Sequence, residues 1–404
     1  MSFAGVVAGT VEEFPAAIGM PSEVGDNRRH ETFDYNLPPL DESEGSGRKT
    51  ICVTGATGFL GSHVVMRLLA AGHKVHGTCR AADDPSKTEY LRQLPGGENF
   101  TPFRAVLEEE GSFDEAVEGC EILIHTACQP SDICITAKNK QRDIVDRVVQ
   151  GVENVMRSVI RGKDIKRVVL TSSACGLYSS PEERPLGSII NHDCWNERSC
   201  PTFQPFSCAK VFAEKAAWHH HDVQAYTDGE GGFTMAVIHP GMIMGPPVRG
   251  RLDSESIRFM ALALSGSLRS IPDFRVGFVD VRDLAKGLCV AGLKVGVASG
   301  RYPAVHSTVR LWELFEPLVE QMIVPTRPGK SSFFSYVLHA PSRGMSRREV
   351  VEFWGKELLL DGGRFRHELK VEDMNDMPQS VIDMAKRMMV KDLVRTASEG
   401  CGSL

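Results

Sequence analysis

Short apolar runs alternate with amphipathic stretches between Lys49 and Gly241. The apolar runs have the length and composition of buried strands, and the stretches between them carry apolar residues three or four positions apart, as helices do. The predicted strands are 50–53, 74–79, 102–105, 122–126, 167–171 and 235–239, and the predicted helices are 62–71, 112–118, 143–161 and 207–219. This alternation is typical of βαβ units and predicts an α/β fold with a doubly wound parallel sheet.

The pattern changes on both sides of this region. Beyond Gly241, prolines break the chain into shorter pieces, which suit a smaller lobe that covers a substrate. The first 47 residues are rich in proline and acidic side chains and contain too little apolar surface to offset the entropy of ordering. We therefore predict a disordered acidic extension over 1–47, a sheet domain over 48–240, a mainly substrate-binding lobe with returning sheet elements over 241–392, and a flexible tail over 393–404.

The net charge of −6 comes from the N-terminal region. Residues 1–48 hold nine acidic and three basic side chains, so the rest of the chain carries equal numbers of each sign. A balanced body offers no clustered basic face for nucleic acid. No apolar run reaches the roughly 18 residues that cross a bilayer, and the first residues lack the basic region of a targeting peptide. We expect a cytoplasmic protein that binds neither nucleic acid nor membrane.

The sequence gives no sign of a metal site. Its 11 cysteines include no CxxC pair and no cysteine and histidine cluster at zinc-finger spacing, so we expect reduced thiols. Three consecutive histidines, His219 to His221, lie at the end of a predicted helix. Consecutive helical residues face different directions, however, and cannot converge on one ion.

Three glycines follow the first predicted strand at GxxGxxG spacing and lead into the first predicted helix. Gly55 would allow the sharp turn out of the strand, and Gly58 would let the backbone approach a pyrophosphate. Gly61 would let the helix pack close to the sheet while its N-terminal N–H groups face the anion. In this context of strand, turn and helix, the spacing predicts a dinucleotide site.

Arg80 directly follows the second predicted strand, where sites that select NAD usually carry an acidic residue for the ribose hydroxyls. A guanidinium at this position favours a 2′-phosphate through its charge and its bidentate geometry. Lys87 would add a second positive charge. The pair predicts NADP or NADPH as the cofactor, and the alternative that both are solvated surface cations stays open.

Several motifs occur in an order that a known family shares. They include the turn Val53 to Ser62 and the segments Gly111 to Ala116, Leu170 to Ala174, Lys210 to Trp218, His239 to Gly241 and Val279 to Ala285. Over about residues 49–390 the chain resembles the dihydroflavonol reductase and cinnamoyl-CoA reductase branch of the extended short-chain dehydrogenase/reductases, within the NAD-dependent epimerase/dehydratase superfamily. The resemblance implies that 48–240 is an NADP-binding Rossmann domain. It also implies an NADP(H)-dependent oxidoreductase that reduces a carbonyl or oxidises a secondary alcohol.

The same resemblance assigns the cofactor contacts. The pyrophosphate would lie on the glycine turn, the 2′-phosphate at Arg80 and Lys87, and the nicotinamide beside Pro240 and Ile243. The full set is Gly55, Thr57, Gly58, Phe59, Leu60, Gly61, Arg80, Lys87, Leu107, Thr126, Ala127, Lys210, Pro240 and Ile243. One departure is the pair Val106-Leu107, where the family often has Asp-Leu, and we expect it to weaken adenine binding without abolishing it.

The resemblance also points to a catalytic site with one group missing. Family members use a Tyr-x-x-x-Lys pair and a serine after the fifth strand: the tyrosine is the acid, the lysine lowers its pKa and binds the ribose, and the serine holds the substrate oxygen. This chain keeps Ser173 and Lys210, but Phe206 stands at the tyrosine position. A phenyl ring cannot transfer a proton, and a general acid contributes about 10² to 10⁴ in rate.

Three interpretations of Phe206 are open. In the first, Ser173, a water on Lys210, or Tyr178 donates the proton and the protein is a slower or altered reductase. In the second, Cys208 or a group of the substrate does so. In the third, catalysis is lost and the chain is a nucleotide-binding pseudoenzyme that senses redox state or binds a partner.

Two further expectations concern what the protein binds. A sugar epimerase or dehydratase on the same fold would need a nucleotide-diphosphate site in the C-terminal lobe, where the sequence has no clear basic cluster. We expect a small carbonyl or alcohol substrate instead, and the fold class allows a homodimer formed through a pair of helices.

Overall fold

The computed structural model describes residues 47–129, 137–185, 187–228, 232–249, 254–268, 270–294, 296–324, 329–339 and 346–390. Nearly all of the predicted N-terminal extension and all of the predicted C-terminal tail lie outside these residues. The centre of the molecule is a seven-stranded parallel sheet in the order β10-β6-β5-β4-β1-β2-β3. Its strands are β1 (Thr50–Thr54), β2 (Lys74–Cys79), β3 (Phe100–Arg104), β4 (Ile122–His125), β5 (Arg167–Thr171), β6 (Thr234–Pro240) and β10 (Gly300–Ala304).

The sheet has an apolar core on each face. In β1, Ile51 and Val53 belong to the core on one face, and Cys52, which lies between them, belongs to the core on the other. The same alternation separates Ile124 from Leu123 in β4. A strand that is buried on both faces needs apolar residues at nearly every position, and this is why these strands appear in the sequence as continuous apolar runs.

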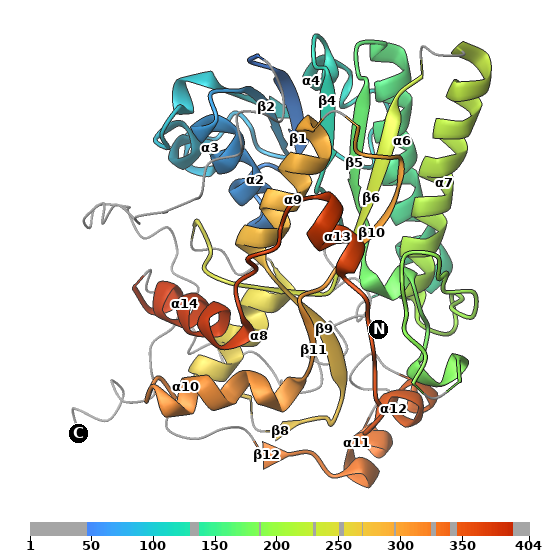
Figure 1. The fold of residues 1–404 in the computed structure, drawn as a ribbon, viewed down its shortest axis with the longest axis vertical. Helices are drawn as coiled ribbons and strands as arrows, with labels where there is room; N and C mark the ends of the chain where they lie inside the picture. The colour runs from blue at the N-terminus through green and yellow to red at the C-terminus, as the bar shows by residue number, and fades with distance from the viewer. Residues whose placement is uncertain are drawn as a thin grey trace.

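Helices cover both faces (Figure 1). One face carries α2 (Phe59–Ala70), α9 (Val281–Leu293) and α13 (Gly363–Glu368), and the other carries α4 (Asp114–Val117), α6 (Arg147–Gly162) and α7 (Pro205–Asp228). A π-helical turn, Gln141–Asp146, leads into α6, and α3 (Pro85–Arg92) follows β2. The doubly wound fold and its six predicted strands are confirmed, although β3 begins two residues before the prediction and α7 continues well beyond it.

A second lobe follows β6. It contains a three-stranded sheet, β11-β9-β7, and a two-stranded sheet, β12-β8. Its elements are β7 (Met242–Met244), α8 (Glu255–Leu264), β8 (Ser270–Ile271), β9 (Arg275–Asp280), β11 (Ser307–Arg310), α10 (Glu316–Glu320), β12 (Gly329–Lys330), α11 (Phe333–His339), α12 (Arg347–Phe353) and α14 (Met377–Val390). Only Gly241 separates β6 from β7, so the lobe faces the carboxyl end of the main sheet, which is where ligands bind in doubly wound folds.

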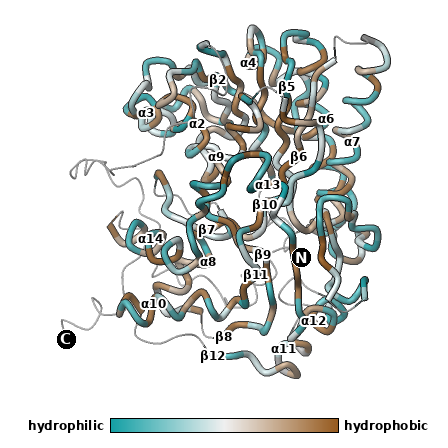
Figure 2. Tube along the Cα trace, in the orientation of Figure 1, coloured by the Kyte–Doolittle hydropathy of each residue, from teal (hydrophilic) through white to brown (hydrophobic). Residues whose placement is uncertain are grey.

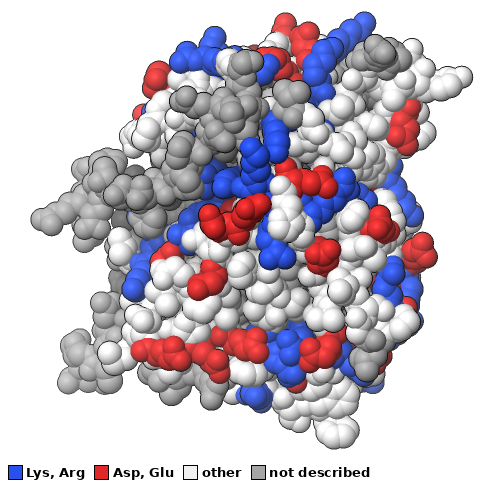
Figure 3. Space-filling view, viewed as in Figure 1, with Lys and Arg blue, Asp and Glu red and all other residues white. Residues whose placement is uncertain are grey.

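The lobe has its own apolar core, around the buried rings of Phe259, Phe274, Phe278 and Phe315. Apolar residues are concentrated along the strands of the main sheet, and polar residues dominate α13 (Figure 2). On the face shown in Figure 3, basic and acidic side chains are interspersed. Within the described residues, no helix is both long and apolar enough to cross a membrane.

Candidate active site

The glycine turn lies between β1 and α2. Gly55 has a positive φ of 67°, and its carbonyl oxygen accepts a hydrogen bond from the Gly58 N–H at 2.9 Å. A Cβ on Gly61 would lie 2.1 Å from the Gly55 oxygen, and a Cβ on Gly55 would lie 2.9 Å from Ala127 Cα. A side chain at either position would therefore clash with the backbone. This agrees with the sequence prediction that these glycines allow a sharp turn and close packing of the helix.

The same turn fits an anionic ligand. Gly58 is the N-cap of α2, and the first turn of this helix contains no acidic residue. Thr57, Gly58 and Phe59 are partly exposed, whereas Leu60 packs in the core. A helix N-terminus that is free of acidic side chains attracts a phosphate through its unpaired N–H groups and its dipole.

Positive charge gathers beside this turn. Arg80 is exposed directly after β2, and Lys87 Nζ lies 3.9 Å from Asp84 Oδ2 at the start of α3. A third cation comes from the lobe: Arg249 lies over the Tyr90 ring at 5.1 Å and donates to the Ser86 carbonyl oxygen. The sequence analysis missed Arg249, because more than 150 residues separate it from α3 and no motif marks it.

The ends of β1 and β4 are tied together where the strand order reverses. Thr126 Oγ1 donates to the Thr54 carbonyl oxygen at 2.6 Å, and Ala127 N donates to Thr54 Oγ1 at 3.2 Å. His125 Nδ1 lies 2.7 Å from the same Oγ1 atom. Burial, together with the charge of Lys210, lowers the pKa of His125 to about 3, so its imidazole is neutral at physiological pH.

Phe206 and Lys210 lie one turn apart at the start of α7. Lys210 Nζ is 5.6 Å from the centre of the Phe206 ring. Among the described residues, no hydrogen bond or ion pair to this ammonium is found. Ser173 follows β5, is partly exposed, and accepts a hydrogen bond from Cys175 N at 3.4 Å. The side chains at the three predicted catalytic positions thus come from the carboxyl end of β5 and the first two turns of α7.

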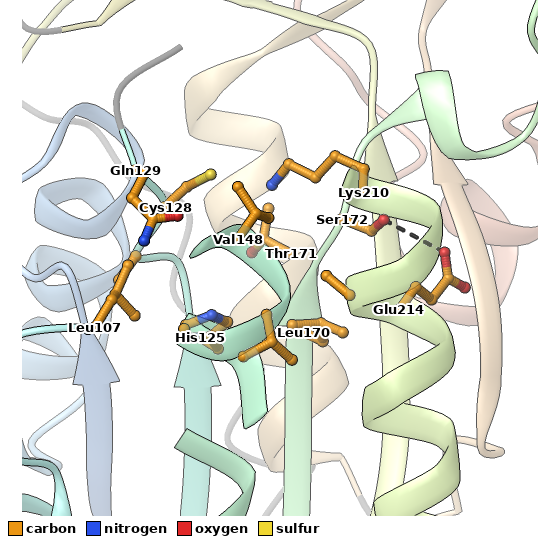
Figure 4. A pocket seen from close by; sticks show the side chains of 14 residues that line it. Leu107, His125, Cys128, Gln129, Val148, Leu170, Thr171, Ser172, Lys210 and Glu214 are labelled. Atoms are coloured by element: carbon orange, nitrogen blue, oxygen red, sulfur yellow. Dashed lines mark hydrogen bonds between the residues drawn. The ribbon is translucent and has the colours of Figure 1, made fainter. Parts of the chain in front are cut away.

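Lys210 points into a pocket between the sheet and helices α6 and α7 (Figure 4). Two other predicted cofactor residues, Leu107 and Ala127, line the same pocket. The remaining walls come from His125, Cys128, Gln129, Val148, Gly151, Val152, Leu170, Thr171, Ser172, Ala213 and Glu214. The structure therefore brings together residues from the ends of β3, β4 and β5 with the lysine of α7.

The other predicted site residues do not line this pocket. Ser173 and the glycine turn lie outside its walls. Pro240 ends β6 and is buried, and Ile243 lies in β7 and is partly exposed. Both lie at or just beyond the carboxyl end of β6, next to the lobe.

Two side chains considered as replacement acids are poorly suited to that role. Tyr178 is 5% exposed and packs against Phe353, and burial raises its pKa well above the usual value. Cys208 is fully buried in the core under α7, and burial raises its pKa to about 11. Their burial keeps both groups away from a substrate and so opposes proton donation.

Sequence reasoning also missed a buried group of charged and polar side chains around Glu214, at the wall of the pocket. Glu214 Oε2 lies 2.7 Å from His239 Nε2, and Glu214 Oε1 accepts from Arg301 Nε at 2.7 Å. No spacing rule connects these residues, because they come from α7, β6 and β10. In the part of the chain that is described, no group of three or more potential metal ligands is present.

Comparisons with known proteins agree with this architecture. A profile of the NAD dependent epimerase/dehydratase family matches residues 51–301. The chain belongs to this family. The resemblance seen in the sequence is thereby confirmed.

Within the family, the chain is similar to plant reductases. Cinnamoyl-CoA reductase 1 of Arabidopsis thaliana is 32% identical over 285 residues, which cover 70% of this chain and 77% of that protein. Dihydroflavonol 4-reductase of Gerbera hybrida is 28% identical over 346 residues, or 83% of this chain and 86% of that protein. Among solved structures, Gre2 of Candida albicans in complex with NADPH aligns with a TM-score of 0.68 at 22% identity, covering 85% of this chain and 99% of that one. At this identity the likeness shows a common fold.

Proposed function

We propose that the chain is an NADP(H)-dependent oxidoreductase that reduces a carbonyl or oxidises a secondary alcohol. The observation that carries the proposal is the position of Lys210, whose ammonium points into a pocket also lined by Leu107 and Ala127 at the carboxyl end of the sheet. The names of its relatives support this class, since cinnamoyl-CoA reductase and dihydroflavonol 4-reductase are both reductases.

The residues present fit the cofactor. Because Gly61 has no side chain, α2 packs directly against the Gly55 carbonyl oxygen and offers its N-terminus to the pyrophosphate. Arg80, Lys87 and Arg249 would bind the 2′-phosphate, and Gre2, which has the same fold, was solved with NADPH. When bound, the cofactor supplies or accepts the hydride. Lys210 would hold its ribose hydroxyls, and Ser173 would orient the substrate oxygen.

The proton must come from a group other than a tyrosine. Tyr178 and Cys208 are buried and do not face a substrate, so they are disfavoured. Ser173 is partly exposed, and the Lys210 ammonium can hold a water molecule next to the Phe206 ring. We therefore infer that Ser173 or a water on Lys210 donates the proton, with a turnover below that of an enzyme with the tyrosine.

A second candidate function rests on Phe206. If neither Ser173 nor a water replaces the acid, the chain is a catalytically impaired protein that binds NADP(H) and reports redox state or recruits a partner. The glycine turn and Lys210 serve cofactor binding in both cases, so their presence does not distinguish the two functions.

Turnover separates the candidates. The natural chain and Lys210→Ala are assayed with NADPH against a panel of aldehydes and ketones, with NADPH oxidation as the readout. The reductase predicts oxidation that depends on substrate and falls by at least about tenfold in Lys210→Ala. Tight NADPH binding without any oxidation would favour the impaired protein.

A further inference from the structure

A buried carboxylate lies one helical turn beyond Lys210. Glu214 is 1% exposed, and each of its two oxygens has partners. Oε1 accepts from Arg301 Nε at 2.7 Å and from Trp218 Nε1 at 3.4 Å. Oε2 lies 2.7 Å from His239 Nε2. It also accepts from Ser172 Oγ at 3.3 Å (Figure 4).

The partners of Glu214 adjoin the residues of the proposed site. Ser172 precedes Ser173 at the end of β5, and His239 precedes Pro240 at the end of β6. Lys210 lies four positions before Glu214, on the same side of α7. One carboxylate therefore joins the helix that carries the lysine to the two strand ends that carry the other site residues.

Arg301 extends this network to the loop before α7. Its guanidinium stacks on the Trp195 ring at 3.8 Å, and its Nη1 donates to the carbonyl oxygens of His192, at 3.0 Å, and Cys194. This loop leads directly to Phe206. Through Arg301, Glu214 thus links α7 to the segment that precedes it.

A buried network of charges contributes little net stability to a fold. Burial opposes ionisation of Glu214, but the charges and hydrogen bonds of His239 and Arg301 outweigh it and lower the pKa to about 2. Burying an ion costs several kcal/mol, and replacing a buried ion pair with apolar residues is often neutral or stabilising. What an apolar cluster would not provide is a fixed geometry, because hydrogen bonds are directional and apolar contacts are not.

We propose that Glu214 is a positioning residue that holds Lys210, and with it the NADP(H) ribose, in register with the strand ends carrying Ser173 and Pro240. This inference rests on the proposed function, because it requires that Lys210 binds the cofactor. It assigns Glu214 no contact with substrate.

A double-mutant cycle on NADPH binding tests the inference without requiring turnover. The dissociation constant of NADPH is measured by fluorescence titration for the natural chain, Glu214→Gln, Lys210→Ala and the double variant. Each single change is expected to weaken binding about tenfold, and the double variant about as much as Lys210→Ala alone, because Glu214 acts through the lysine. Where a carbonyl substrate is turned over, Glu214→Gln lowers kcat while KM for that substrate stays within about twofold.

Asp383→Asn is the matched control. It breaks another partly buried ion pair, at 2.8 Å between Oδ2 of Asp383, in α14 of the lobe, and Nη1 of Arg282, at the start of α9. It is expected to lower the melting temperature and leave the NADPH dissociation constant unchanged. If Glu214→Gln does not fold, Glu214→Asp takes its place in the cycle, since it keeps the buried charge but shortens its reach by one methylene.

The outcomes are distinguishable from those for the proposed function. The inference is overturned if Glu214→Gln binds NADPH like the natural chain, if the two losses multiply in the double variant, or if Asp383→Asn weakens binding equally. A natural chain that binds no NADPH overturns both the inference and the proposed function. If it binds NADPH with the predicted coupling but turns over no carbonyl, only the proposed catalysis fails.

Discussion

The ammonium nitrogen of Lys210 lies 5.6 Å from the centre of the Phe206 ring. The aromatic ring thus occupies the place where the family resemblance puts a phenol, one turn from the lysine that would lower the pKa of that phenol. Phe206 keeps the packing of such a ring but has no hydroxyl group. On the proposed function, a single oxygen atom separates this site from the catalytic set that the resemblance implies.

Arg80 is expected to select the cofactor. Arg80→Ala removes the cation that follows β2, so it should weaken NADPH binding by about tenfold or more and leave NADH binding nearly unchanged. The measurement is the rise in melting temperature with each cofactor. The control is Arg92→Ala, which removes an exposed arginine at the end of α3. Equal stabilisation of the natural chain by NADPH and NADH would contradict the assignment.

Gly58 and Gly61 should differ in how well they tolerate an added methyl group. A Cβ on Gly61 would lie 2.1 Å from the Gly55 oxygen, whereas a Cβ on Gly58 would lie 3.2 Å from the same atom. Gly61→Ala is therefore expected to cost about 1–3 kcal/mol of stability and to abolish NADPH binding. Gly58→Ala should cost less stability but still weaken NADPH binding. Urea unfolding and fluorescence titration measure the two effects, and equal stability of the variants would show that the turn is not packed as described.

Two buried histidines should make the protein sensitive to acid. Burial lowers the pKa of His63 to about 4, and burial and Lys210 lower that of His125 to about 3, whereas an unfolded histidine titrates near 6.5. Below that pH the unfolded chain binds protons that the folded chain does not. The stability from the neutral imidazoles is therefore complete above pH 6.5 and is lost as the pH falls towards 4 and then 3.

The fall in the free energy of unfolding per pH unit can be measured. Each histidine contributes up to about 1.4 kcal/mol per pH unit, so urea unfolding between pH 7 and pH 5 should show falling stability. His125→Gln should reduce the slope by the share of one buried histidine, and His219→Gln, at an exposed position of α7, should leave it unchanged. Identical slopes for all three proteins would rule out this origin.

The parts of the fold and site that local sequence determines were predictable. Buried strands such as β1 and β5 need continuous apolar runs, and the turn from Gly55 to Gly61 needs glycine where backbone atoms come within contact distance. Both features are readable from neighbouring residues alone. The positions of Phe206 and Lys210 on one helix followed from the resemblance, and α7 places them one turn apart.

The parts that depend on tertiary contacts were not predictable. Glu214, His239 and Arg301 meet only because β6 and β10 are neighbours in the sheet and α7 packs beside them. Arg249 reaches Tyr90 from the lobe for a similar reason. Charged residues usually lie at the surface, so a sequence gives no local sign that these are buried.

Restoring the missing hydroxyl tests the central claim most directly. Turnover of aldehydes and ketones with NADPH is compared between the natural chain and Phe206→Tyr, with NADPH binding measured in parallel. The account predicts that both bind NADPH equally and that Phe206→Tyr turns over a shared substrate about 10² to 10⁴ times faster, with an activity that Lys210→Ala removes. A Phe206→Tyr chain that binds NADPH but is no faster than the natural chain would contradict the placement of Phe206 at the acid position of a reductase site.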